Sequence, residues 1–284
     1  MHQLVLPSGS TVPSLGLGTW RMGESSSARR AEVAAIRRAI ELGYRLFDTA
    51  EMYGEGGAEE ALGQALAEAL RAGDVKREQL FIVSKVYPHN ASRSGTPAAC
   101  ERSLRRLGLD QLDLYLLHWP GNHPLRDTVA AFERLQSQAR IRDWGVSNFD
   151  ADDMAGLWGL EGGAACATNQ VYYALSERGI EYDLLPLQRE RRVPLMAYCP
   201  LAQGGLAGHA GLQKLAAQRG VTATQLALAW VLKQPGVIAI PKAVREAHLR
   251  ENLAAADLDL DDAALSDIDR LFPAPRRKSP LAMS

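Results

Sequence analysis

Four side chains suited to acid–base chemistry lie at the ends of three apolar runs in the sequence. Asp48 and Tyr53 belong to RLFDTAEMYG, Lys85 to LFIVSKVY and His118 to LDLYLLHWP. Each run is typical of a buried β-strand, and its polar residue follows where the strand stops. An ionisable group in such a place is costly to desolvate, so it usually has a charged partner or a catalytic role. A carboxylate, a phenol, an amine and an imidazole are the groups that acid–base chemistry on a carbonyl would use.

A purely structural role explains each of these residues singly but explains all four together poorly. Asp48 and Lys85 could form an ion pair, Tyr53 could pack in a loop, and a lone histidine is often a core residue. A phenol acts as an acid near neutral pH only if its pKa, about 10 when unperturbed, is lowered. A nearby ammonium would lower it by stabilising the phenolate. We therefore expect Tyr53 to donate a proton, with Lys85 and Asp48 tuning it. His118 would orient the carbonyl oxygen.

Further polar residues end the later strands. Ser147 and Asn148 (GVSNF) and Gln170 (TNQVYY) suit a carboxamide, which has one acceptor and two donors. Turn formation and helix capping are a real alternative for the first two, because a helix follows them, and a weaker one for Gln170. Tyr198, in LMAYCPLAQGG, offers an aromatic face to a flat ring. Lys242, in VIAIPKAVREAHLREN, precedes a helix, where barrels often bind phosphate. A solvated helix start explains Lys242 as well as a phosphate site does.

The elements that position these residues alternate regularly between strand and helix. Strands are predicted at 15–18, 45–48, 80–85, 111–118, 141–146, 167–171, 193–198 and 236–240, after a β-hairpin at 3–12. Amphipathic segments such as AEEALGQALAEALRAG lie between them and stop at glycine. Eight such units favour a closed (β/α)₈ TIM barrel over an open sheet, and the carboxyl ends of barrel strands carry the chemistry. We predict a single domain over residues 1–284, with a flexible tail from about 273 to 284.

The glycine-rich segment GLGLGTW does not form a dinucleotide-binding fingerprint. Three positions after Gly18 the sequence has Arg21 in place of the required glycine, and no long helix opens there. A tight turn at a strand end is the better interpretation, so any dinucleotide must bind without a Rossmann domain.

Composition excludes several classes of function. The 284 residues carry a net charge of −1 and 46% are hydrophobic, which is typical of an ordinary globular protein and gives no reason to expect nucleic acid or membrane as a partner. The three cysteines have no CxxC spacing, so neither a disulfide framework nor a metal site is predicted. The sequence contains no signal peptide and no apolar run near the ~20 residues that span a bilayer, so we predict a cytoplasmic protein.

Over residues 3 to 272 the chain resembles the aldo-keto reductases, in particular bacterial members with a short C-terminal tail. The resemblance rests on GLGTW, FDTAEMYG, SKV, LLHWP, GVSNF, NQVYY, YCPLA and IPKA…REN, which occur in this order. It implies a (β/α)₈ barrel with an N-terminal hairpin plug, a monomer that reduces aldehydes and ketones by hydride transfer from a nicotinamide cofactor, with tyrosine as the general acid.

The matching motifs imply a role for each of several residues. The catalytic tetrad would be Asp48, Tyr53, Lys85 and His118. The cofactor would contact Thr19, Trp20, Ser147, Asn148, Gln170, Tyr198, Pro200, Leu201, Lys242, His248, Glu251 and Asn252. The substrate pocket would be lined by Trp20, Tyr87 and Trp119.

Two departures from the family pattern bear on the choice of cofactor. The family often has Ser or Thr where this chain has Ala243, and Arg where it has His248; both positions help to hold the 2′-phosphate of NADPH. We expect NADPH as the cofactor, with NADH possible. The 2′-phosphate would then be bound mainly by Lys242. His248 would contribute more to phosphate binding as its imidazole becomes protonated at lower pH.

The resemblance also narrows the substrate. The short tail and the brief insert after His118 imply an open pocket for small aldehydes and α-dicarbonyls such as methylglyoxal. Members that reduce carbon–carbon double bonds replace this histidine with an acid, so histidine favours carbonyl reduction. Two alternatives remain: a nicotinamide-binding regulatory subunit like the accessory subunits of potassium channels, and a diketogluconate or sugar-acid reductase.

Overall fold

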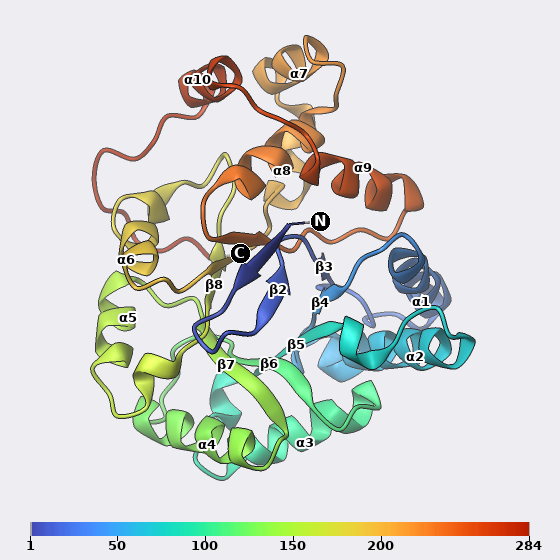
Figure 1. Cartoon of the computed structure of the whole chain (residues 1–284), viewed down its shortest axis with the longest axis vertical. Helices are drawn as coiled ribbons and strands as arrows, with labels where there is room; N and C mark the ends of the chain where they lie inside the picture. Colours follow the sequence, from blue (N-terminus) through green and yellow to red (C-terminus); the bar gives the residue numbers. More distant parts are fainter. Residues whose placement is uncertain (1, 284) are drawn as a thin grey trace.

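The computed structural model describes residues 2–283 and contains, in that range, eight parallel strands surrounded by helices (Figure 1). The sheet order is β10-β9-β8-β7-β6-β5-β4-β3, so each strand pairs with its neighbour in sequence. Bridges from Leu15 to Ala239 and from Gly18 to Lys242 join the two ends of this order. The sheet is therefore a closed barrel, and the predicted (β/α)₈ fold is confirmed.

The strands agree closely with the predicted ones. They are β3 (Leu17–Gly18), β4 (Leu46–Asp48), β5 (Phe81–Val86), β6 (Leu112–Leu117), β7 (Ile141–Ser147), β8 (Asn169–Tyr172), β9 (Leu195–Tyr198) and β10 (Val237–Ala239). The predicted hairpin is also present, as β1 (Gln3–Val5) paired antiparallel with β2 (Thr11–Pro13). Every predicted strand overlaps an observed one, because buried parallel strands are continuous apolar runs that stop at turns.

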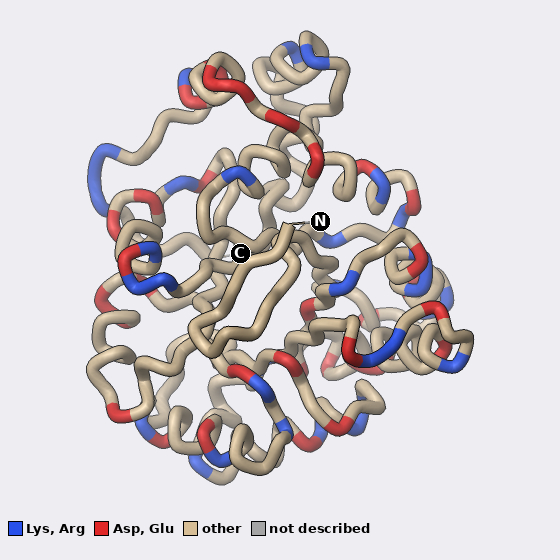
Figure 2. The backbone as a smooth tube through the Cα atoms, in the orientation of Figure 1, with Lys and Arg blue, Asp and Glu red and all other residues tan. Residues whose placement is uncertain are grey.

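One α-helix follows each strand from β3 to β8, two follow β9 and two follow β10, and together they cover the outside of the barrel. They are α1 (Ser26–Glu41), α2 (Gly57–Ala72), α3 (Gly95–Leu107), α4 (Leu125–Ser137), α5 (Ala151–Trp158), α6 (Leu184–Glu190), α7 (Ala210–Ala217), α8 (Ala223–Lys233), α9 (Glu246–Ala256) and α10 (Asp262–Leu271). Helices α2 and α3 end at Gly73 and Gly108 in the left-handed conformation, as the glycine stops predicted. Lys and Arg positions are interspersed with Asp and Glu positions along these outer helices (Figure 2).

The glycines of GLGLGTW allow the barrel to close. A Cβ atom on Gly18 would lie 2.8 Å from the carbonyl oxygen of Ile240, the residue after β10. The backbone N–H of Gly18 also donates to the carbonyl of Pro241, so the first and last strands meet here. Glycine is therefore required at this position for a close backbone approach within the barrel. The turn predicted at the strand end follows at Trp20 and Arg21.

The hairpin closes the amino-terminal end of the barrel. Leu6 and Val12 pack in one cluster with the inward-facing side chains at the starts of the strands, among them Leu46, Phe81 and Leu114. Figure 1 shows the hairpin lying across the middle of the barrel. With this end filled by apolar side chains, the polar strand ends on the opposite rim are left to form a site. No helix in residues 2–283 is long and apolar enough to cross a membrane.

Candidate active site

A cavity of about 710 Å³ opens at the carboxyl ends of the strands. Its lining includes most of the predicted site residues, which are Trp20, Asp48, Tyr53, His118, Trp119, Ser147, Asn148, Gln170, Tyr198, Pro200, Leu201, Lys242, His248, Glu251 and Asn252. Parallel strands in a barrel end on one rim, so residues far apart in sequence meet there. The volume lies within the usual range of about 300–1,000 Å³ for ligand pockets.

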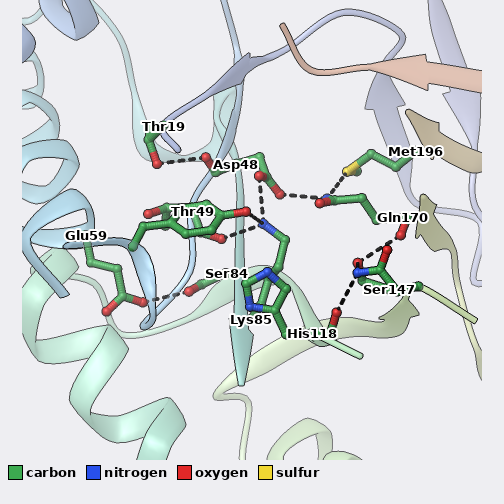
Figure 3. A network of polar contacts seen from close by, with 12 residues as sticks. Thr19, Asp48, Thr49, Glu59, Ser84, Lys85, His118, Ser147, Gln170 and Met196 are labelled. Atoms are coloured by element: carbon green, nitrogen blue, oxygen red, sulfur yellow. Dashed lines mark hydrogen bonds and ion pairs between the residues drawn. The ribbon is translucent and has the colours of Figure 1, made fainter. Parts of the chain in front are cut away.

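Lys85 lies at the centre of the tetrad and is completely buried (Figure 3). Its Nζ donates to Asp48 Oδ2 at 2.7 Å, to the carbonyl of Thr49 at 3.0 Å and to Tyr53 Oη at 3.1 Å. These three acceptors use all three protons of the ammonium group. Tyr53 therefore receives a hydrogen bond on its oxygen, and its own proton stays available to a ligand in the cavity.

The pKa of Tyr53 differs from the sequence-based expectation. We expected the Lys85 ammonium to lower it, but burial of the phenol, followed by the charges of Asp48 and Cys199, raises the pKa of Tyr53 well above its ordinary value. Burial also lowers the pKa of Lys85, while the Asp48 carboxylate opposes this change. The phenol thus stays protonated and able to act as an acid. The hydrogen bond from Lys85 stabilises the phenolate that forms when the proton leaves.

His118 lies beside this group as a neutral imidazole. Its ring meets that of Tyr53 edge-on at 5.5 Å between centroids. Burial, and secondarily the charge of Lys85, lowers the pKa of His118 well below its ordinary value. Its Nδ1 atom has no hydrogen-bond partner within residues 2–283. A neutral imidazole at this place can orient an oxygen atom without adding a second buried cation.

The amide and hydroxyl groups predicted to bind a carboxamide lie together on the next strand ends. The register places Ser147 directly opposite Gln170. Asn148 donates through Nδ2 to the carbonyl of His118 and to Ser147 Oγ, and its Oδ1 accepts from Tyr198 at 2.9 Å. Gln170 donates through Nε2 to Asp48 Oδ1 at 2.8 Å. These groups are therefore held in fixed orientations by one another and by the tetrad.

Basic side chains also line the cavity. Lys242, Arg245 and His248 line it from the loop before α9 and from the first turn of that helix, beside Glu251 and Asn252. The lining thus offers amide and hydroxyl groups from the strand ends and positive charge from Lys242 and Arg245. An extended ligand with a carboxamide at one end and an anionic group at the other fits this set of donors and acceptors.

Buried carboxylates outside the cavity support the tetrad. Glu59, on α2, is fully buried behind β5, where it accepts from Ser84 at 2.6 Å and from Arg106 at 2.9 Å. Glu51 accepts from the backbone N–H of Tyr87 at 2.9 Å and is paired with Arg102. Each carboxylate is thus paired with an arginine and accepts a hydrogen bond from a residue close to Lys85 in sequence, Ser84 or Tyr87. A buried charge of this kind needs such a partner to be tolerated.

Some predicted residues lie behind the cavity wall. Lys85 is not among the residues that line the cavity, but its Nζ contacts Tyr53 and Asp48, which do line it. Thr19 donates from Oγ1 to the carbonyl of Asp48 at 3.0 Å and so fixes the backbone of the tetrad aspartate. Tyr87 packs edge-on against Trp119 at 5.0 Å and supports that ring. Thr19 and Tyr87 therefore support residues that line the cavity and do not line it themselves.

Several cavity residues were not predicted from the sequence. They are Gly18, Arg21, Met52, Cys199, Gln203, Gly204, Ala207, Thr224, Ile240, Pro241, Arg245 and Met283. Arg245 lies only three residues after Lys242, but a charged residue near a helix start gives no signal of its own. Met283 belongs to the tail, which has no periodic pattern. Lys278 pairs there with Asp152 at 2.9 Å and Asp183 at 3.3 Å, and the tail returns to the cavity.

Comparison with known proteins agrees with this geometry. The aldo/keto reductase family matches residues 14–272. The chain is 50% identical to the methylglyoxal reductase YeaE of Escherichia coli strain K12 over 278 residues, covering 96% of this chain and 95% of that protein. It is 35% identical to a glyoxal reductase of Bacillus subtilis, covering 94% and 91% of the two chains.

A protein of known structure is about as similar to this chain in sequence as the Escherichia coli protein is. The crystal structure of an aldo-keto reductase from Klebsiella pneumoniae in complex with NADPH has a TM-score of 0.93 and 49% identity, covering 100% of both chains. This protein therefore belongs to the aldo/keto reductase family and is an oxidoreductase.

Proposed function

We propose that this protein reduces small aldehydes and α-dicarbonyls, such as methylglyoxal, to alcohols with NADPH. The observation that carries the proposal is the hydrogen-bonded chain Asp48–Lys85–Tyr53 beside a cavity that Lys242 and Arg245 also line. The names of the similar proteins, a methylglyoxal reductase and a glyoxal reductase, support the substrate class. The NADPH complex of the similar Klebsiella protein supports the cofactor.

The residues present fit NADPH. Ser147, Asn148 and Gln170 offer the donors and acceptors that a nicotinamide carboxamide requires, and Tyr198 offers a ring face beside them. Lys242 and Arg245 supply positive charge to the same cavity. When bound, the cofactor would supply the hydride.

The chain's own residues would perform the acid catalysis. Tyr53 donates its proton to the carbonyl oxygen, and the resulting phenolate is stabilised by the ammonium of Lys85. Asp48 holds Lys85 in place through the 2.7 Å ion pair. His118, as a neutral imidazole, orients the carbonyl oxygen toward Tyr53. Water then returns a proton to Tyr53 after the alcohol leaves.

The walls around the tetrad suit a small substrate. The ring of His118 lies 4.8 Å from that of Trp119, and Trp20, Met52 and Met283 also line the cavity. These large side chains surround Tyr53 with apolar surface. Small carbonyl compounds fit this arrangement better than extended or highly charged ones. We further propose that the protein acts in the cytoplasm as a monomer, with small molecules as its only partners.

A substrate panel tests the proposal. Methylglyoxal, glyoxal, simple aldehydes and a keto sugar acid would each be offered with NADPH, and oxidation of the cofactor would be followed by its absorbance. We expect turnover with the first three and a loss of roughly 10²–10⁴-fold in the Tyr53→Phe variant, since that is the usual contribution of proton transfer. Turnover with the sugar acid alone would favour the sugar-acid reductase. Wild-type turnover no faster than that of Tyr53→Phe would favour a nicotinamide-binding regulatory subunit.

A further inference from the structure

Glu51 joins two of the segments that build the active site. It lies in the turn between β4 and Tyr53, and only 7% of its side chain is exposed. Its Oε1 atom accepts from the backbone N–H of Tyr87 at 2.9 Å and from Asn90 Nδ2 at 3.0 Å. These two donors flank the short 3₁₀ helix Pro88–Asn90 in the loop after β5. One carboxylate oxygen therefore holds this loop at both of its ends.

Arg102, on α3, compensates the charge of Glu51. Its guanidinium donates to Oε2 at 3.1 Å, and the arginine side chain is 37% exposed. A buried carboxylate needs such a cation to be tolerated. The two oxygens of Glu51 thus have separate tasks, because Oε2 contacts the cation and Oε1 anchors the loop. A substitution can therefore remove one task and leave the other.

The loop that Glu51 anchors supports part of the cavity wall. The ring of Tyr87 meets that of Trp119 edge-on, with 5.0 Å between centroids and 82° between planes, and Trp119 lines the cavity. The loop after β6, which carries Trp119, also packs closely on the loop after β5. A Cβ atom on Gly121 would lie only 2.7 Å from the Cβ atom of Pro88. The place of the Trp119 ring therefore depends on the loop after β5.

We infer that Glu51 is a positioning residue that sets the substrate selectivity of this protein. It anchors the loop after β5, the loop fixes Tyr87, and Tyr87 holds the indole of Trp119 beside the tetrad. The inference rests on the proposed function, because it concerns which carbonyl compounds fit against Trp119. An indole held in one place discriminates by shape between a small α-dicarbonyl and a bulkier aromatic aldehyde. Glu51 is not part of the cavity lining in residues 2–283, so it acts only through these neighbours.

Selectivity can be measured as the kcat/KM for methylglyoxal divided by the kcat/KM for benzaldehyde, at saturating NADPH. Glu51→Ala removes both hydrogen bonds to the loop, and we expect this ratio to fall roughly 10-fold, the lower end of what the fit of a pocket contributes. The dissociation constant of NADPH, measured by fluorescence quenching, should be nearly unchanged. Tyr87→Leu removes the ring behind Trp119 and should lower the ratio similarly. The double variant should lower it no further.

Two conservative variants separate the anchor from the charge. Glu51→Gln keeps a side-chain oxygen that can accept from Tyr87 and Asn90, but it loses the ion pair with Arg102. Arg102→Gln leaves both hydrogen bonds to the loop and removes the cation. Both variants should unfold at a lower urea concentration than the wild type and retain its selectivity ratio. A loss of stability is thereby distinguished from a loss of selectivity.

Asn90→Ala keeps the test decisive if Glu51→Ala does not fold. It removes one of the two hydrogen bonds and leaves the ion pair in place, so the selectivity ratio should fall by a smaller factor. An unchanged ratio in Asn90→Ala and Tyr87→Leu, or in a folded Glu51→Ala protein, would overturn the inference.

Three other results would also decide the matter. An equal loss of kcat for both aldehydes in Glu51→Ala would mean that Glu51 acts on the turn that carries Tyr53, which contradicts a role in selectivity. A Glu51→Gln protein as unselective as Glu51→Ala would mean that the charge of Glu51 matters and its anchoring bonds do not. A wild type that reduces neither aldehyde would overturn the proposed function, and this inference with it.

Discussion

The side chain of Gln170 donates a hydrogen bond to Asp48 at 2.8 Å, across 122 residues of sequence. Asp48 accepts at its other oxygen from Lys85 at 2.7 Å (Figure 3). Gln170, a residue of the proposed nicotinamide site, thus forms a direct hydrogen bond with Asp48 of the tetrad. Binding of the cofactor and the charge arrangement of the tetrad are therefore linked through one carboxylate.

Replacement of Gln170 should therefore affect both binding and catalysis. In Gln170→Leu, Asp48 loses a donor to a buried charge, a bond worth about 1.5–3 kcal/mol. We expect a comparable loss in the free energy of unfolding, weaker binding of NADPH and NADH alike, and slower turnover. Urea denaturation, fluorescence titration and steady-state kinetics would measure these three effects. Ser147 lies at the opposite register position and does not contact Asp48. Ser147→Ala should therefore change the binding of NADPH and NADH while retaining most of the free energy of unfolding.

Loss of Lys85 should destabilise the protein as well as slow the reaction. In Lys85→Met the carboxylate of Asp48 is left buried without its cation, which typically costs about 3–5 kcal/mol. Turnover should fall by roughly 10²–10⁴-fold because the phenolate of Tyr53 loses its stabilising hydrogen bond, while NADPH affinity should be nearly retained. The double variant Asp48→Asn, Lys85→Met should recover part of the stability and none of the turnover. A Lys85→Met protein that turns over normally but fails to bind NADPH would assign Lys85 to the cofactor instead.

His118 should make the protein less stable in mild acid. Its pKa is lowered in the folded state, so the unfolded chain binds a proton first as the pH falls. The stabilisation is complete above the unfolded pKa of about 6.5 and declines below it, by at most about 1.4 kcal/mol per pH unit. Urea denaturation between about pH 7 and pH 5 should show a steeper loss for the wild type than for His118→Gln. The exposed His89, changed to Gln, should leave the wild-type slope unaltered.

The C-terminal tail should affect the KM for the substrate and leave the dissociation constant of NADPH nearly unchanged. Lys278 pairs with Asp152 and Asp183, and five residues later Met283 lines the cavity. These pairs are exposed and screened by solvent, so they should add little to stability. Lys278→Gln should therefore raise KM for methylglyoxal a few-fold, with the melting temperature and the NADPH dissociation constant nearly unchanged. Arg276→Gln, at a tail residue without an ion pair in the described chain, is the matched control. Equal KM values in all three proteins would leave the tail as the flexible segment that the sequence predicted.

The sequence by itself determined the fold and the composition of the catalytic group. Apolar runs that stop at Asp48, Lys85 and His118 predict buried strands, and alternation with amphipathic segments predicts a closed parallel barrel. A barrel brings the carboxyl ends of all its strands to one rim, so residues at those ends must meet whatever their separation in sequence. For this reason the tetrad could be predicted from local patterns alone.

Only the tertiary structure decided how these groups act on one another. The bond from Gln170 to Asp48, the contact between Arg245 and His248 and the return of Met283 to the cavity depend on side-chain directions that no local pattern encodes. The pKa of Tyr53 was expected to fall because a cation is near it, yet it rises because of burial of the phenol, followed by the charges of Asp48 and Cys199. Desolvation depends on the packing around a group from every side, and so it is fixed only when the whole chain has folded.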